Sequence, residues 1–295
     1  MKLKADSPTF AATETLAQAR TKLAAALAAA SKEPAALESR HLMQEATGLT
    51  PLLLLTDAER HLGHGAAILL QQFAARRLAG EPVSRILGRS SFYGLDICVK
   101  PEVLDPRNDT ETLVDAALAI LEAKSIDGPR ILDLGTGSGA ILCALLHCRD
   151  DAFGVGADIS PFACALTRHN LALCGLSNRS GVICGDWTEA LQGQFDLIVS
   201  NPPYIAHCEI AALEPEVVTF DPMLALDGGE DGLVPYRRIA SNLKRLLRRG
   251  GAACFEIGWR QAADVNHILE AEGFSGAKTF TDGGQRDRVV AIEAL

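Results

Sequence analysis

The sequence predicts an α/β fold in which helices cover a mostly parallel β-sheet, preceded by a small helical domain. Two observations indicate this. From about residue 130 onward, short apolar runs typical of buried strands alternate with helical segments, which is the pattern of a parallel sheet with crossover helices. Before residue 80, the apolar residues recur at helical spacing instead. A chain of 295 residues is also long enough for two domains.

The N-terminal part of the chain is predicted to be a bundle of helices. Thr13 is a suitable N-cap for a first, alanine-rich helix, and Pro34 opens a second helix that ends at Gly48. A short apolar piece covers residues 52–55, and a further helix covers 66–78. Because none of these segments carries an evident chemical group, we expect the region to serve partner recognition or packing.

The composition changes at Gly80-Glu81-Pro82, and the next segment is predicted to be a β-hairpin. Strand-like residues run from 86 to 103, with a turn within 92–96. Asp109 is then expected to cap the following helix. We therefore expect three parts, which are a helical domain over residues 1–84, a hairpin linker over 85–105 and an α/β domain over 106–295.

The α/β domain is expected to contain seven strands and four main helices. The strands cover residues 131–134, 153–157, 182–184, 195–199, 252–257, 278–280 and 289–292. The helices cover residues 140–147, 162–174, 236–247 and 261–272.

The composition excludes several classes of protein. The formal net charge of −9 argues against a protein that follows nucleic-acid phosphates. The eight cysteines form no Cys-x-x-Cys pair, and most lie in apolar runs, which favours reduced, buried residues over disulfides or a zinc site. No run approaches the roughly 20 apolar residues of a membrane span. We therefore expect a cytoplasmic protein that binds no membrane and no metal.

The segment Asn201-Pro202-Pro203-Tyr204 follows a predicted buried strand. Proline cannot continue a central strand, so the chain must leave the sheet at Pro202. Asn201 and Tyr204 then lie at the carboxyl end of a strand, where ligands bind in open α/β sheets. Fixed carbonyls, an uncharged amide and an aromatic face can together hold a planar amide or an amino-aromatic group. The structural alternative is a strand-ending turn with a core tyrosine.

A glycine-rich loop joins the first strand of the sheet to its helix. The loop contains Gly135, Thr136, Gly137, Ser138 and Gly139. Glycines let the backbone approach a ligand closely, and the N-terminus of a helix follows. The loop also fits the dinucleotide pattern Gly-x-Gly-x-x-Ala, so by itself it does not separate a nicotinamide cofactor from S-adenosylmethionine.

Two further strand ends carry groups suited to a nucleoside. Asp158 ends the second strand, where a carboxylate can accept hydrogen bonds from both ribose hydroxyls. Asp186 and Trp187 follow the third strand, where an acid and an indole can hold adenine by its edge and its face. Each residue alone could be a cap or a core residue. Their occurrence on successive strand ends favours a cofactor site.

The Asn-Pro-Pro-Tyr segment favours methyl transfer over hydride transfer. A planar amide or amino nitrogen is a weak nucleophile because its lone pair is delocalised. Acceptors for its two N–H bonds, Asn201 Oδ1 and the Pro202 carbonyl, would favour a pyramidal nitrogen and align it with a methyl sulfonium. This chemistry requires no metal and no strong general base, and the sequence shows no cluster with metal-ligand spacing.

With these residues, the chain resembles the protein-(glutamine-N5) methyltransferases that modify peptide-chain release factors. The resemblance covers nearly the whole length, and the segments outside the Asn-Pro-Pro-Tyr motif make it specific. Asp105 and Asn108 depart from the family pattern, which has an apolar residue and a proline there. The segments that carry the resemblance are residues 80–83, 86–89, 133–140, 201–205, 214–217, 225–229, 231–233, 236–237 and 286–290.

The resemblance implies a Rossmann-like, seven-stranded methyltransferase sheet over residues 106–295, with an N-terminal domain for substrate recognition. It implies S-adenosylmethionine as cofactor, release factors as protein partners and the glutamine of a Gly-Gly-Gln motif as target. Asn201, Pro202 and Tyr204 would be catalytic, with Pro203 and Phe92 also contacting the substrate. The cofactor would contact Gly135, Thr136, Gly137, Ser138, Gly139, Asp158, Asp186, Trp187 and Asn201.

Other functions remain open at this point. An amino-methyltransferase acting on adenine or cytosine shares the Asn-Pro-Pro-Tyr motif, but the net charge disfavours it. A glutamine of a ribosomal protein is an alternative target, while a non-enzymatic binding module and a nicotinamide oxidoreductase fit the motifs less well. Gly283-Gly284-Gln285 repeats the letters of the expected target motif, which we interpret as a coincidence.

Overall fold

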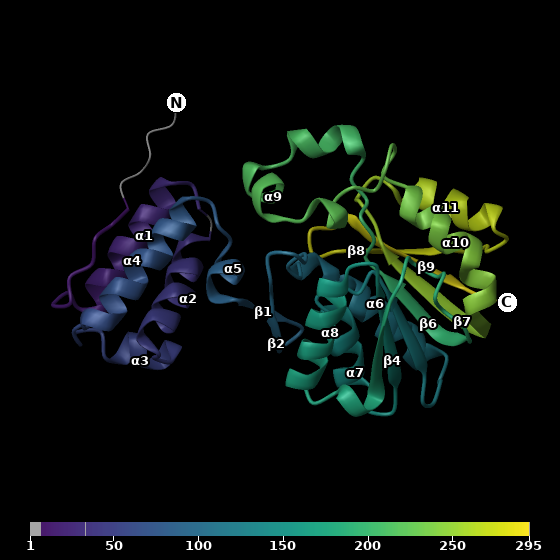
Figure 1. Cartoon of the computed structure of the whole chain (residues 1–295), viewed down its shortest axis with the longest axis horizontal. Coiled ribbons are helices and arrows are strands. Elements are labelled where there is room, and N and C mark those ends of the chain that lie inside the picture. Colours follow the sequence, from purple (N-terminus) through teal and green to yellow (C-terminus); the bar gives the residue numbers. More distant parts are fainter. Residues whose placement is uncertain (1–6, 33, 295) are drawn as a thin grey trace. The chain divides into compact units, whose positions relative to one another are not determined.

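The computed structural model describes residues 7–32 and 34–294. The chain divides into two compact units, Met1–Gly88 and Arg89–Leu295. The first is a bundle of helices and the second contains both β-sheets, as Figure 1 shows. Among the described residues, no helix combines the length and the apolar character that crossing a membrane requires.

The first unit is built around a core of leucines and alanines. Leu23, Leu27, Leu42 and Leu70 are fully buried in it. Its helices are α1 (Leu16–Ala29), α2 (Ala35–Thr47), α3 (Pro51–Thr56), α4 (His64–Leu78) and α5 (Val83–Leu87). The predicted bundle is therefore present, and the short apolar piece at 52–55 belongs to a helix of its own.

The start of α1 differs from the prediction. Thr15, not Thr13, is the N-cap, because its hydroxyl accepts a hydrogen bond from the Gln18 backbone N–H while the Gln18 side chain accepts one from the Thr15 N–H. This reciprocal capping box is stronger than a single cap. The predicted ends of α2 are confirmed, since Pro34 precedes it and Gly48 ends it in the left-handed conformation.

The second unit begins with a short hairpin, β1 (Arg89–Phe92) and β2 (Leu95–Cys98). Its turn residues, Tyr93 and Gly94, both have positive φ, which the favoured two-residue hairpin turns require. The hairpin does not stand apart as a linker, because Phe92 and Ile97 are buried in the core of the second unit. Residues 86 and 87, which were predicted to be part of the hairpin, belong to α5 instead.

The main sheet has seven strands in the order β5-β4-β3-β6-β7-β9-β8, and β9 alone runs in the direction opposite to the other six. All seven predicted strands are confirmed. Strand β3 lies between β4 and β6, so the strand order reverses beside it, and in open α/β sheets this is where ligands bind. The strands are β3 (Arg130–Leu134), β4 (Phe153–Asp158), β5 (Ser180–Cys184), β6 (Phe195–Ser200), β7 (Leu247–Glu256), β8 (Lys278–Thr281) and β9 (Asp287–Glu293).

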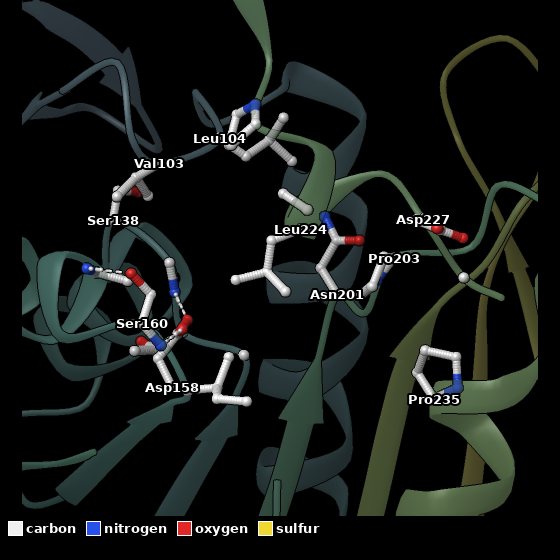
Figure 2. A pocket seen from close by; sticks show the side chains of 18 of the residues that line it. Val103, Leu104, Ser138, Asp158, Ser160, Asn201, Pro203, Leu224, Asp227 and Pro235 are labelled. Atoms are coloured by element: carbon white, nitrogen blue, oxygen red, sulfur yellow. Dashed lines mark hydrogen bonds between the residues drawn. The ribbon is translucent and has the colours of Figure 1, made fainter. Parts of the chain in front are cut away.

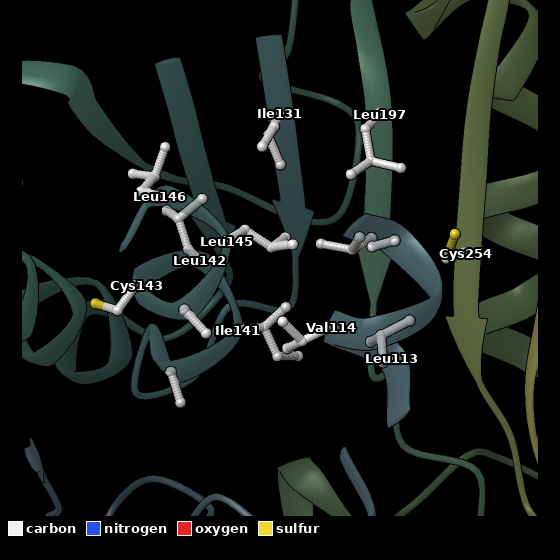
Figure 3. Packing of buried hydrophobic residues seen from close by; sticks show 14 of the residues in the cluster. Leu113, Val114, Ile131, Ile141, Leu142, Cys143, Leu145, Leu146, Leu197 and Cys254 are labelled. Carbon is white, nitrogen blue, oxygen red and sulfur yellow. The ribbon is translucent and has the colours of Figure 1, made fainter. Parts of the chain in front are cut away.

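Helices cover both faces of this sheet, because alternate strand residues point to opposite sides. Leu197 and Ile131 pack with residues of α6 and α7 in one core, which Figure 3 shows, whereas Ile198 and Leu132 pack with residues of α10 and α11 in the other. The helices are α6 (Glu111–Ala123), α7 (Ala140–Cys148), α8 (Pro161–Leu173), α10 (Val234–Leu246) and α11 (Ala262–Ala271). The four predicted helices are confirmed.

Short helical segments complete the second unit. A 3₁₀ turn, η1 (Asn108–Thr110), precedes α6, so Asp109 does not cap that helix as predicted; its carboxylate lies 3.2 Å from the Arg288 guanidinium. Between β6 and α10 lie η3 (His207–Ala212), α9 (Pro215–Phe220) and η4 (Met223–Ala225), which the sequence did not predict. A further turn, η2 (Ser177–Arg179), precedes β5.

Candidate active site

A cavity of about 610 Å³ opens at the carboxyl ends of β3, β4 and β6. This volume is within the range of small-molecule sites. Figure 2 shows Asp158 and Ser138 on one side of it and Asn201 and Pro203 on the other. The predicted site residues that line it are Gly135, Thr136, Gly137, Ser138, Asp158, Asp186, Trp187, Asn201 and Pro203.

The loop between β3 and α7 forms one wall of the cavity with backbone. Gly135, Gly137 and Gly139 all have positive φ, a conformation that favours glycine. A Cβ atom on Gly135 would lie 3.3 Å from the Trp187 ring, and one on Gly139 would lie 2.8 Å from the Thr167 side chain. The glycines therefore permit both the turn and the close packing around it.

Asp133, two residues before the start of this loop, holds it through Thr136. The side chain is fully buried, and Thr136 Oγ1 donates a hydrogen bond of 2.7 Å to Asp133 Oδ2. Burial raises the pKa of Asp133 to about 7. Asp133 does not line the cavity, so its contribution is to hold Thr136.

Asp158 lies at the end of β4 with both carboxylate oxygens directed to backbone amides. Gly137 N–H donates to Oδ2 at 2.9 Å, and Ser160 N–H donates to Oδ1 at 2.8 Å. Burial raises the pKa of Asp158, while these two hydrogen bonds act in the opposite direction. Each ionised oxygen can accept more than one hydrogen bond, so the anchored carboxylate is still able to bind ribose hydroxyls.

Asp186 and Trp187 extend this wall beyond β5. Asp186 Oδ2 accepts a hydrogen bond of 2.7 Å from Arg238 Nη2, so the acid that was predicted to contact adenine already has a cationic partner at the cavity. Trp187 is half-buried and has a φ of 46°, and its ring packs beside Gly135. The indole thus links the third strand end to the glycine loop.

Asn201 occupies the other half of the cavity, directly after β6. Its Nδ2 donates a hydrogen bond of 3.2 Å to Thr110 Oγ1 on η1. In the part of the chain that the structure describes, Asn201 Oδ1 accepts no hydrogen bond from the protein. The NH₂ group of Asn201 thus hydrogen-bonds within the protein, which leaves its Oδ1 atom to accept a hydrogen bond from a ligand.

A second loop, residues 228–232, packs against the backbone of the Asn-Pro-Pro-Tyr segment. A Cβ on Gly228 would lie 2.7 Å from the Pro203 carbonyl oxygen, and one on Gly232 would lie 2.4 Å from that of Tyr204. Only glycine permits such close approach of two backbones. Ile205 pairs with this loop as well, through the hydrogen bond from Gly228 N–H to the Ile205 carbonyl oxygen at 2.8 Å.

Four predicted site residues do not line the cavity. Phe92 is 1% exposed and packs in the core of the second unit, so the structure does not bring it to the target site. Tyr204 packs against the other core, and its carbonyl accepts a hydrogen bond of 2.9 Å from Gln261 Nε2. Pro202 and Gly139 lie behind the surface residues.

Other cavity residues were not predicted. Thr110 and Arg107 come from the segment after the hairpin, and Met223 and Leu224 come from η4. Met223 is 52% exposed and Leu224 is 60% exposed, which makes the rim beside Asn201 apolar (Figure 2). Two consecutive apolar residues in an acidic, proline-containing loop are the sequence signal that could have indicated them.

Neither a metal-binding cluster nor a disulfide is found among the described residues. The described residues hold no group of three or more histidine, cysteine, aspartate or glutamate side chains arranged to bind a metal. All eight cysteines are free thiols.

Family comparisons cover both units. Residues 18–88 match the family described as the PrmC N-terminal domain, and residues 110–229 match the methyltransferase small domain. A release factor glutamine methyltransferase of Rhodospirillum rubrum is 49% identical over 236 residues, which cover 80% of this chain and 72% of that protein. The enzymes of the same name from Agrobacterium fabrum (44% identity, 87% and 89% coverage) and Caulobacter vibrioides (40%, 94% and 96%) are similar over more of their length.

Solved structures share the architecture at lower identity. The hMettl16 catalytic domain in complex with a MAT2A 3′UTR hairpin superposes with a TM-score of 0.57 at 18% identity, covering 76% of this chain and 82% of that chain. At this identity the likeness concerns the fold alone. It confirms the methyltransferase-type sheet that the sequence predicted.

Proposed function

The chain belongs to the release factor glutamine methyltransferase family, and we propose that it transfers a methyl group from S-adenosylmethionine to the side-chain amide nitrogen of a glutamine in a release factor. We further propose that this glutamine is the one in the Gly-Gly-Gln motif. Because release factors work on ribosomes, the site of action would be the cytoplasm.

One observation supports the proposal most strongly. The cavity combines a backbone-lined nucleoside wall with an asparagine whose amide oxygen is free to accept a hydrogen bond. A primary amide needs such an acceptor for an N–H bond of the nitrogen that receives the methyl group. The same cavity holds both groups, as a direct transfer between cofactor and amide requires.

The residues of the first wall fit S-adenosylmethionine. The glycine loop leaves room where side chains would otherwise stand, and Asp158 offers anchored carboxylate oxygens to the ribose. Asp186 and Trp187 lie where the adenine would be held, with Arg238 keeping the Asp186 carboxylate in place. When bound there, the cofactor supplies an electrophilic methyl group on a sulfonium.

The residues of the second wall would bind and orient the glutamine amide. Asn201 Oδ1 would accept one N–H bond, and the Pro202 carbonyl, as expected from the sequence, would accept the other, so that the nitrogen becomes more pyramidal as it attacks. The new bond joins nitrogen to the methyl carbon, the bond from that carbon to sulfur breaks, and one amide proton leaves to water. Pro203 contacts the amide from the cavity wall.

Tyr204 and Phe92 would act in a different way from the one first expected. Neither side chain lines the cavity, so we propose that Tyr204 holds the Asn-Pro-Pro backbone through its core packing and its bond with Gln261. Phe92 would hold the hairpin against α6 in the same manner. The contact with the face of the substrate amide, which the sequence assigned to the ring of Tyr204, would then come from the apolar side chains of Met223 and Leu224 instead.

The first unit would recognise the protein partner. Every residue that lines the cavity lies after residue 101, so the cofactor site is complete within the second unit. We propose that the helical domain, predicted over residues 1–84, binds the release factor, and that the domain over 106–295 performs the transfer.

The test is a methyl-transfer assay with two acceptors. Purified protein is incubated with S-adenosylmethionine and either a release factor or an adenine-containing oligonucleotide. We expect one methyl group on the release factor, located on the glutamine by peptide mass spectrometry, and none on the oligonucleotide. Methylation of the oligonucleotide alone would contradict the proposal and support the amino-methyltransferase alternative.

A further inference from the structure

A buried carboxyl group lies behind Asn201, outside the cavity. Glu256 is the last residue of β7, and Ser200 pairs with Phe255 in the β6–β7 register, so Asn201 and Glu256 lie side by side at the strand ends. Glu256 is 2% exposed and does not line the cavity. An acid in such a position is costly to bury unless other groups satisfy it.

Thr110 connects this acid to Asn201. Asn201 Nδ2 donates to Thr110 Oγ1 at 3.2 Å, and the Glu256 carboxyl group lies close enough to the side chains of Thr110 and Asn201 for both to act against the burial that raises its pKa. Thr110 is also buried, with 4% of its surface exposed. Because the Thr110 oxygen accepts from Asn201, its own proton is free to point to Glu256.

The hydrogen bonding of the Glu256 carboxyl group is incomplete. Glu256 Oε2 is fully buried and has no hydrogen-bond partner among residues 7–32 and 34–294. The Glu256 backbone carbonyl, by contrast, accepts a hydrogen bond of 2.7 Å from the Tyr236 hydroxyl, which fixes the backbone on this side. A buried acid with an oxygen that lacks a partner requires an explanation beyond packing.

The charged and titratable groups around Glu256 come from β9, η1, α10 and two loops. Arg288 on β9 is the nearby cation, and it also contacts Asp282 at 3.0 Å and Asp109 at 3.2 Å. Tyr204 and Tyr236 lie close enough for their own pKa values to be raised, mainly by burial and in part by Glu256. Burial raises the pKa of Glu256 to about 7, although Thr110 and Arg288 oppose the shift.

We propose that Glu256 is a positioning residue for methyl transfer, which acts through Thr110 to hold the Asn201 amide with its oxygen toward the cavity. This inference rests on the proposed function. The ionised carboxylate can only accept hydrogen bonds, so it attracts the Thr110 proton and the Asn201 N–H group. The side-chain amide of Asn201 is then prevented from rotating to present its NH₂ group to the substrate.

Protonation of Glu256 would remove this orientation. A protonated carboxyl group can donate to Thr110 Oγ1, after which the Thr110 hydroxyl can donate to Asn201 Oδ1 and favour the reversed amide. The reversed amide offers a donor where the substrate N–H needs an acceptor. Turnover at saturating cofactor and substrate is therefore expected to rise with pH through about 7 and to level off above it.

The decisive variant is Glu256→Gln, studied in the full-length protein. Its side-chain oxygen still accepts from Thr110 but does not titrate. We expect kcat to stay within about tenfold of the wild-type plateau and to be nearly constant between about pH 6 and pH 8. Glu256→Leu, which lacks any acceptor, should lower kcat about 100-fold while the cofactor Kd stays nearly unchanged. The exposed Glu122→Gln on α6 is the matched control and should keep the wild-type pH profile.

Thr110 provides an independent test of the same chain of contacts. Thr110→Val removes the hydroxyl and should reproduce the kcat loss of Glu256→Leu, whereas Thr110→Ser should restore most of the rate. Because both residues act on one amide, the loss in the Thr110→Val, Glu256→Leu double variant should equal that of either single variant. Thermal unfolding and cofactor binding confirm that each variant is folded.

The outcomes separate this inference from the proposed function. If the wild type does not methylate the release factor, the proposed function fails before Glu256 is tested. If the wild type is active and Glu256→Gln keeps its pH-dependent limb, Glu256 does not set the orientation of Asn201. Additive losses in the double variant, or a changed KM with unchanged kcat in Glu256→Leu, would also overturn the inference.

Discussion

The two halves of the cavity are held by different kinds of contact. The cofactor half is made of backbone turns and one anchored carboxylate, with Gly135, Gly137 and Asp158 close together in space. The acceptor half depends on side chains, because Asn201 is oriented by Thr110 and lies beside the buried Glu256. We therefore expect the cofactor half to tolerate almost no added atoms and the acceptor half to tolerate almost no change in hydrogen bonding.

The largest expected effect comes from breaking the acceptor half alone. Asn201→Ala should lower kcat for methyl transfer by about 100-fold to 1000-fold, since one lost hydrogen bond to the reacting group in a closed site has this magnitude. Although the resemblance also implied a cofactor contact for Asn201, this residue lies in the acceptor half, so calorimetry should show a nearly unchanged Kd for S-adenosylmethionine. A comparable loss of cofactor affinity would mean that the two halves are not separable.

Asn201→Asp tests whether the acceptor half requires an amide at this position and not only an acceptor. The new carboxylate would keep an acceptor but would lose the donor to Thr110 and would place a second acid beside Glu256. We expect the rate on the release factor to fall at least as far as in Asn201→Ala. Wild-type activity of the aspartate variant, measured by the same transfer assay, would contradict this account of the amide.

Adding a side-chain atom in the cofactor half should lower the stability of the protein. Gly139→Ala combines a positive φ with a Cβ only 2.8 Å from Thr167, so it should lower the free energy of unfolding by about 2–4 kcal/mol. Gly250→Ala is the control, because Gly250 has a similar φ of 76° but nothing within 4 Å of the added Cβ. Its cost should be about 1 kcal/mol. Equal midpoints of urea unfolding for the two variants would show that the Thr167 contact does not matter.

Cofactor affinity should fall when the carboxylate of this half is removed. Asp158→Ala leaves the N–H groups of Gly137 and Ser160 without their acceptor and takes the anion away from the ribose hydroxyls. We expect weaker binding of S-adenosylmethionine by about 1.5–3 kcal/mol in calorimetry. An unchanged Kd would remove Asp158 from the ribose site.

The smallest effect on the cofactor should follow removal of the first unit. Residues 89–295 contain every residue that lines the cavity, so a chain of these residues should bind S-adenosylmethionine with nearly wild-type Kd. The KM for the release factor should rise strongly, because the helical domain would no longer bind it. Equal loss of both properties would assign the first unit a structural role in the site.

The cofactor half could be predicted from the sequence because its signals are local. Apolar runs located all seven strands. Gly135 directly follows β3, Asp158 is the last residue of β4, and Trp187 comes shortly after the end of β5. The glycine pattern and the strand ends thus place these residues on one edge of the sheet without any knowledge of long-range contacts.

The acceptor half could be predicted only in part, because its contacts join distant segments. Thr110 and Asn201 are 91 residues apart, and Glu256 lies on another strand, so no local pattern connects them. Phe92 was expected at the target but is buried, since a hairpin aromatic can face either the core or the ligand. Met223 and Leu224 belong to helical turns too short for periodicity to reveal.

The most direct test of the central claim is the mass of the release factor peptide that contains the target glutamine. Wild-type protein and Asn201→Ala are each incubated with S-adenosylmethionine and release factor, and the peptide is then sequenced by tandem mass spectrometry. Our account predicts one added methyl group on the glutamine side chain with the wild type and almost none with the variant. A methyl group on another residue, or an unmodified peptide with the wild type, would contradict it.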